Sequence, residues 1–113
     1  MGVEFSVELH STAVRNIDRF NGTSQRCFRI SSLHMDAARY RFEPANTVLF
    51  LYNPFGEPVM TEVLGNIKRD NTEQNYDFYI IYCNPTLSKL FDQQDMFETI
   101  DTVPGIDFYR LRR

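Results

Sequence analysis

Two segments of this chain are continuous runs of β-branched, aliphatic and aromatic side chains, and both are too short for helices. They are Thr47–Tyr52 and Phe78–Cys83. A strand with one face in water would alternate polar and apolar residues, so these runs are typical of strands buried on both faces of a parallel sheet. Each run is followed by Asn-Pro, and proline ends a strand because it has no N–H for the ladder. We therefore expect two neighbouring parallel strands with helices on both faces.

Two further segments have apolar residues at every third or fourth position, which predicts amphipathic helices. The first extends from Val7 to Phe20, with Ser6 as its N-cap. Its apolar face consists of Leu9, Ala13, Ile17 and Phe20. The second begins at Glu57 and Pro58, since proline is tolerated in the first helical turn. Its buried face consists of Val59, Val63, Leu64 and Ile67. Gly65 costs this helix up to about 1 kcal/mol relative to alanine, which suggests close packing against the sheet.

The remaining elements are shorter. Val3 and Phe5 flank Glu4 as at the end of a strand, and residues 25–30 form a weakly patterned strand. A single helical turn follows Asp36, and Thr86 caps a short helix that carries Phe91. Phe97 to Thr102 pairs with Asp107 to Leu111 across a turn at Pro104-Gly105. Strands and helices thus alternate before a closing hairpin, which predicts an α/β fold.

Length and composition narrow the class of protein. A chain of 113 residues has room for one domain, so we expect a single core over residues 1–113. A formal charge of −3 argues against a nucleic-acid-binding surface held by net positive charge, and no apolar run approaches the roughly 20 residues that cross a bilayer. We expect a soluble, cytoplasmic protein. Cys27 and Cys83 form no CxxC motif, so we expect buried, reduced thiols.

Asn53, Pro54 and Phe55 follow the first apolar strand directly. In open parallel sheets the ligand crevice lies at the carboxyl ends of the strands, so these residues are candidates for an active site. The alternative is a strand-exit turn in which Asn53 bonds to nearby backbone and Phe55 packs. His10 and His34 have no cysteine or carboxylate cluster at ligand spacing, so no metal site is predicted.

Four segments, in this order, resemble the class I S-adenosylmethionine-dependent methyltransferases. They are GVEFSVELHSTAVRNI from Gly2, Met35-Asp36-Ala37, VLFLYNPFGEP from Val48 and FYIIYCNP from Phe78. The resemblance covers nearly the whole chain. It implies a three-layer, Rossmann-like fold whose sheet is mostly parallel with a C-terminal antiparallel hairpin, and it implies S-adenosylmethionine as the cofactor.

The resemblance also assigns cofactor-binding residues. Glu4 would bind the ribose hydroxyls, because a carboxylate can accept from both, with Phe5 beside it. Asp36 and Ala37 would lie near the adenine. The alternatives are that Glu4 is a surface carboxylate and that Asp36 caps a helical turn.

Asn53-Pro54-Phe55 resembles the (Asp/Asn)-Pro-Pro-(Tyr/Phe) motif of enzymes that methylate amine or amide nitrogens, without its second proline. By this resemblance these three residues are catalytic. Asn53 would orient the acceptor nitrogen along the line of methyl transfer and also contact the cofactor, and Phe55 would stack on a flat substrate or on the cofactor.

The first strand and the glycine-rich cofactor loop of that family would precede Met1, and this sequence does not contain them. We therefore expect a domain truncated ahead of its second strand, with a gap between the second and fourth strands of the sheet. A missing central strand removes about 6–12 kcal/mol of apolar burial, and the net stability of a whole domain is about 5–15 kcal/mol. We expect a rearranged sheet, or an exposed sheet edge that pairs with another chain.

Two functional hypotheses follow. The first is methyl transfer from S-adenosylmethionine to an unidentified acceptor, with an amine or amide nitrogen favoured. The second is a non-catalytic module that acts through its exposed sheet edge, as a homo-oligomer or with a complementing chain. We expect neither a membrane nor a nucleic acid as a partner.

Overall fold

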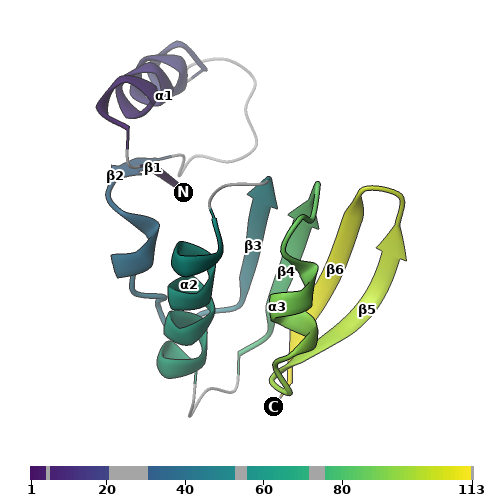
Figure 1. The fold of residues 1–113 in the computed structure, drawn as a ribbon. Coiled ribbons are helices and arrows are strands. Elements are labelled where there is room, and N and C mark those ends of the chain that lie inside the picture. Colours follow the sequence, from purple (N-terminus) through teal and green to yellow (C-terminus); the bar gives the residue numbers. More distant parts are fainter. Residues whose placement is uncertain (5, 21–30, 53–55, 72–75, 113) are drawn as a thin grey trace. The chain divides into compact units, whose positions relative to one another are not determined.

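The computed structural model describes residues 1–4, 6–20, 31–52, 56–71 and 76–112. These residues form two compact units, Met1–Tyr40 and Arg41–Arg113, which appear in purple to blue and in teal to yellow in Figure 1. That the whole chain makes up one domain stays a prediction.

The first unit is built on a parallel strand pair. β1 (Gly2–Glu4) pairs with β2 (Ser32–His34), and α1 (Val7–Phe20) connects to β1 through Ser6. The observed bounds of α1 are the predicted ones, and the N–H of Leu9 donates to Ser6 Oγ at 3.3 Å, which confirms the predicted N-cap. The 3₁₀ helix η1 (Ala37–Arg39) confirms the helical turn after Asp36. The strand predicted at 25–30 lies outside the described residues.

The inner face of α1 differs from the predicted one. Leu9 is 60% exposed, whereas His10, Ala13 and Ile17 are partly buried. β1 and β2 have three residues each, so they offer the helix only a small surface. The apolar period of the sequence located the helix and the Ala13 and Ile17 positions of its inner face, but it placed Leu9 there instead of His10.

The second unit contains a four-stranded sheet in the order β3-β4-β6-β5 and two helices (Figure 1). The elements are β3 (Thr47–Tyr52), α2 (Glu57–Asp70), β4 (Phe78–Cys83), α3 (Ser88–Asp92), β5 (Phe97–Val103) and β6 (Ile106–Leu111). β3 and β4 pair in parallel and in register, from Thr47 with Phe78 to Tyr52 with Cys83. This confirms the predicted parallel neighbours. The predicted hairpin is also confirmed, with Gly105 at φ 79° in its turn.

The expectation of a mostly parallel sheet is wrong for this unit. Of the three strand pairings, only β3 with β4 is parallel, whereas β4 with β6 and β6 with β5 are antiparallel. The reason is that the second hairpin strand, β6, lies between β4 and β5. A hairpin pattern in the sequence predicts the turn but does not indicate which of its two strands joins the rest of the sheet. The fold is therefore mixed α/β.

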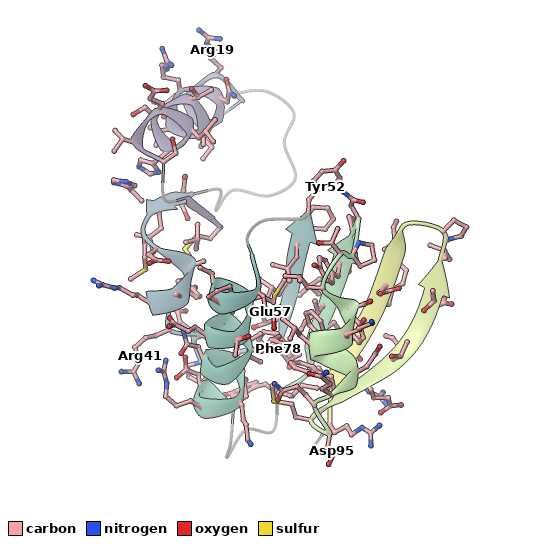
Figure 2. All side chains as sticks on the ribbon, in the orientation of Figure 1. Arg19, Arg41, Tyr52, Glu57, Phe78 and Asp95 are labelled. Atoms are coloured by element: carbon pink, nitrogen blue, oxygen red, sulfur yellow. The ribbon has the colours of Figure 1, made fainter. Side chains whose placement is uncertain are left out.

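The core of the second unit lies between one face of the sheet and the two helices. Leu51, Phe78, Ile80, Tyr82, Phe97 and Tyr109 from the strands, Met60, Val63, Leu64 and Ile67 from α2, and Phe91 from α3 are buried. The sequence pattern predicted Val59 on the buried face of α2, but Met60 is the buried residue. Figure 2 labels Phe78 among the side chains on this side of the sheet.

Phe91 is the centre of an aromatic cluster in this core. Its ring stacks on Tyr109 with centroids 4.5 Å apart, and the rings of Tyr82 and Phe97 each lie 5.4 Å from it. Burial raises the pKa of Tyr109, and the neighbouring Asp107 carboxylate, which accepts its hydrogen bond at 3.1 Å, raises it further. The Tyr109 hydroxyl therefore stays protonated as a donor. This cluster attaches the short helix α3 to three strands.

β3 is not buried on both faces, contrary to the prediction. Val48, Phe50 and Tyr52 are 63%, 61% and 69% exposed, whereas Leu51 on the other face is buried. β3 is the outermost strand of its sheet, and both helices of the unit lie on one face (Figure 1). A continuous apolar run cannot distinguish a strand covered on both faces from one whose second face is open.

Two local predictions are also wrong. A Cβ added at Gly65 would meet nothing within 4 Å, so this glycine makes no close approach to the sheet. The N-cap of α3 is Leu87 rather than Thr86. The N–H of Leu87 donates to the hydroxyl of Tyr82 at 3.1 Å, so a residue of the core supplies the hydrogen bond that a capping side chain would otherwise make.

Asp70 connects the start of the second unit to the end of α2. Its carboxylate accepts from the N–H of Phe42 at 2.9 Å and from Arg69 Nε at 2.8 Å, and its side chain is only 5% exposed. The ring of Phe42 meets Phe78 edge-on, with centroids 5.4 Å apart. The hydrogen bond from Arg69 is the main cause that lowers the pKa of Asp70. Burial opposes it, whereas the hydrogen bond from the Phe42 N–H and the positive charge of Arg41 also lower the pKa.

Replacing Gly65 by alanine is expected to stabilise the second unit by up to about 1 kcal/mol, because alanine restricts the unfolded chain and meets no neighbour in the helix. Gly105→Ala is the matched control. The left-handed φ at Gly105 disfavours any side chain, so this variant should lose stability. Urea unfolding of both variants measures the two free energies, and a destabilised Gly65→Ala would contradict the geometry of α2.

Asp70→Asn is expected to lower the free energy of unfolding by about 1–3 kcal/mol near neutral pH, because it weakens charge-assisted hydrogen bonds of a buried group. Since the pKa of Asp70 is lower in the folded chain, its stabilisation is present above about pH 4 and disappears as the pH falls through the folded pKa. The variant should therefore lose less stability on acidification than the parent does. Urea titrations across this range measure the difference, with the exposed Asp95→Asn as control.

Candidate functional site

The carboxyl ends of β3 and β4 form the candidate site of the second unit. The two strands are in register, so Tyr52 and Cys83 end them at the same edge of the sheet. Asn84 follows with a left-handed φ of 52°, and its N–H donates to the carbonyl oxygen of Gly105 at 2.8 Å. The hairpin turn therefore lies at this same end, as Figure 1 shows. The sharp change of direction at Asn84 ends the strand.

The side chains at this edge are suited to binding and orientation. Tyr52 projects from the end of β3 and is largely exposed (Figure 2). Cys83 is a free thiol and is partly exposed rather than buried as predicted. Asn84 is exposed and can both donate and accept. Asn53, Pro54 and Phe55, the predicted catalytic residues, lie outside the described residues, as does Cys27, so their assignments stay predictions.

In the first unit, the carboxyl ends of β1 and β2 bring together two of the predicted cofactor-binding positions. Glu4 is the partner of His34 in the parallel register, and Asp36 and Ala37 follow His34 directly after Met35. Glu4 and Asp36 therefore lie at the same end of the strand pair, as a shared ligand requires. Phe5 lies outside the described residues.

Asp36 has a structural role in addition to any binding role. Its Oδ1 accepts from the N–H of Ala38 at 3.0 Å and so caps η1. This confirms the alternative interpretation that Asp36 caps a helical turn. The cap uses one carboxylate oxygen, and the carboxylate has further positions that can accept a hydrogen bond. Capping therefore leaves room for a contact to adenine, which stays a prediction.

The structure pairs two histidines that the sequence gave no reason to combine. The rings of His10 and His34 stack with centroids 5.5 Å apart, and His10 Nδ1 is hydrogen-bonded to Ser32 Oγ at 2.8 Å. His10 lies on α1 and His34 at the end of β2, 24 residues later. Only the parallel pairing of β1 with β2 brings them together, so helical or strand periodicity could not have found this contact.

Neither a metal-binding cluster nor a membrane-spanning helix is found in the described part of the chain. Among the described residues, no group of three or more His, Cys, Asp or Glu side chains is placed to hold a metal ion. The helices described here also include none with the length and apolar character needed to cross a bilayer.

Comparison with known proteins adds no relative. A scan of protein-family models finds no match to this chain, and searches among curated proteins and solved structures find no significant match. The methyltransferase resemblance therefore rests on the residues quoted above.

Asn84→Ala is expected to lower the free energy of unfolding by about 1 kcal/mol, because alanine is strained at the left-handed φ that asparagine tolerates. Asn84→Gly should be neutral or stabilising, since glycine adopts this conformation freely. Urea unfolding of both variants is the measurement. Equal losses in the two variants would mean that the side chain of Asn84, rather than its backbone conformation, matters for stability.

Proposed function

We propose that this chain is the part of a class I methyltransferase-like domain that holds S-adenosylmethionine for methyl transfer. The observation that carries the proposal is the parallel, in-register pairing of β3 and β4, each followed in sequence by Asn-Pro. Parallel pairing aligns the two carboxyl ends, and ligands of open α/β sheets bind at such ends. An antiparallel pair would have placed the two Asn-Pro segments at opposite edges.

The roles of the residues follow the resemblance. Glu4 takes the ribose hydroxyls, and Asp36 with Ala37 lies beside the adenine. Asn53 orients the acceptor, an amine or amide nitrogen, while Phe55 stacks on a flat group. Methyl transfer depends mainly on alignment of the acceptor with the methyl group, so hydrogen bonds and stacking suffice for these roles.

The outermost position of β3 in its sheet supports the proposal. In the family a further strand pairs with the strand that matches β3. β3 is outermost in its sheet, so its free side has room for that strand.

Isothermal titration with S-adenosylmethionine tests the proposal. The parent chain should bind with a Kd between about 1 μM and 1 mM, and Glu4→Ala should weaken binding about 10-fold or more, because it removes charge-assisted hydrogen bonds to the ribose. The exposed Glu62→Ala on α2 is the matched control and should bind like the parent. The absence of heat at millimolar cofactor would refute cofactor binding, and equal affinity in the two variants would refute the role of Glu4.

The exposed edge of β3 favours a second candidate function, a non-catalytic association module. The N–H of Thr47 donates to Asp77 O at 2.9 Å. The backbone N–H and C=O groups therefore point to β4 at Thr47, Leu49 and Leu51. The alternate residues Val48, Phe50 and Tyr52 direct theirs to the free side. β3 contains no charged residue and no proline, the features that usually protect an edge strand from pairing. A second copy or a complementing chain could therefore associate here.

A further inference from the structure

The sheet of the second unit has one covered face and one open face. Side chains alternate along a strand, so Leu51, Ile80 and Tyr109, which are buried, define the face under α2 and α3 (Figure 1). The intervening residues point to the other face. Both helices described in this unit lie on the covered side, so within the described residues of the unit no helix covers the open face.

The strand registers show which residues share the open face. They form three rows across the sheet. The first row is Val48, Tyr79, Arg110 and Glu98; the second is Phe50, Ile81, Phe108 and Asp101; the third is Tyr52, Cys83, Ile106 and Val103. The apolar and aromatic members adjoin one another at the β3, β4 and β6 positions, and the charged members lie toward β5. The open face is therefore a contiguous apolar surface with a polar margin.

The three rows of this surface carry one positive side chain, Arg110, and two negative ones, Glu98 and Asp101. Arg110 Nη2 lies 3.1 Å from Glu98 Oε2 and so pairs with it across β5 and β6. Although the whole chain has a formal charge of −3, Asp101 is the one unpaired charge in the three rows. Two copies of this face can approach with little like-charge repulsion.

The area of the surface fits a dimer. An aromatic side chain buries about 150–250 Å² when it is covered. The exposed surface of Val48, Phe50 and Tyr52, added to that of the half-buried residues beside them, comes to about 600–700 Å² per copy. A standard interface buries about 800 Å² per partner. An extended peptide added to the edge of β3 would leave the rows of β4 and β6 uncovered, whereas a second sheet face would cover all three rows.

We infer that the open face of β3, β4 and β6 is a dimer interface in which a second copy of this chain packs sheet on sheet. Such a contact is isologous: the same apolar rows of both copies interdigitate about a two-fold axis. Phe50 and Phe108 lie in the central row and are the main anchors. This inference goes beyond the second candidate function, which uses the edge of β3, and it is independent of cofactor binding.

Sedimentation velocity of the full chain tests the dimer. The parent should sediment as a dimer at about 10–100 μM, as interfaces of this size usually allow. Phe50→Lys and Phe108→Lys should each weaken dimerisation about 100-fold or more, because both copies lose a central anchor. Leu9→Lys is the matched control, since Leu9 is as exposed as Phe50 but lies on α1, and it should remain dimeric.

Two results would overturn the inference. One is a parent chain that stays monomeric at about 100 μM, where a standard interface should be occupied. The other is a dimer that Phe108→Lys leaves intact, because β6 lies inside the sheet and association would then use the edge of β3. Glu4→Ala should dimerise like the parent, so failure of cofactor binding and failure of dimerisation are separate outcomes.

A second measurement avoids substitutions in the sheet. Cys83 lies on the open face in the same row as Tyr52, so a dimer should shield its thiol. Alkylation of Cys83 in the parent chain, located by peptide mass mapping, should slow about 10-fold or more between dilute and concentrated protein as the dimer forms. A rate that does not depend on concentration would contradict the dimer even if the lysine variants do not fold.

Discussion

The parallel pairing of β3 with β4 is the constraint on which the second unit depends. Parallel neighbours cannot be joined by a tight turn, so the chain must cross over, and α2 makes that crossing. The crossing places Met60, Leu64 and Ile67 over one face of the sheet, where they form the core with Ile80. The same pairing brings the ends of both strands, and Asn84 after them, to one edge. The parallel pairing of β3 with β4 therefore positions both the core and the candidate site.

A helix covers only one face of a sheet, and the second unit has both of its helices on the same face. α3 is held there by the stacking of Phe91 on Tyr109, so it cannot cover the opposite side. Val48, Phe50 and Tyr52 are therefore left exposed. An exposed row this apolar is uncommon on a monomer and marks an interaction surface. The proposed dimer and the proposed cofactor site use different parts of the same strands, the face and the carboxyl ends, so the two proposals are compatible.

The first unit shows how a short strand pair can collect polar groups. β1 and β2 are three residues each, yet their parallel register sets Glu4 beside His34 and places Asp36 just beyond. Two of these groups already have structural partners: Asp36 caps η1, and His34 stacks on His10. A ligand at this end would meet side chains that are already oriented by such contacts, which lowers the entropy lost on binding.

The sequence by itself determined the elements. The period of apolar residues located α1 and α2, continuous apolar runs located β3 and β4, and the turn at Pro104-Gly105 located the β5–β6 hairpin. Ser6 and Asp36 were recognisable as caps. These signals are local and depend on neighbours within a few residues. Tertiary structure alone decided which strand edges meet and which faces are covered. The insertion of β6 between β4 and β5, the open face of β3 and the pairing of His10 with His34 all depend on contacts between residues that are far apart in the sequence. No local pattern encodes such contacts, since a buried strand and an exposed one can carry the same apolar side chains.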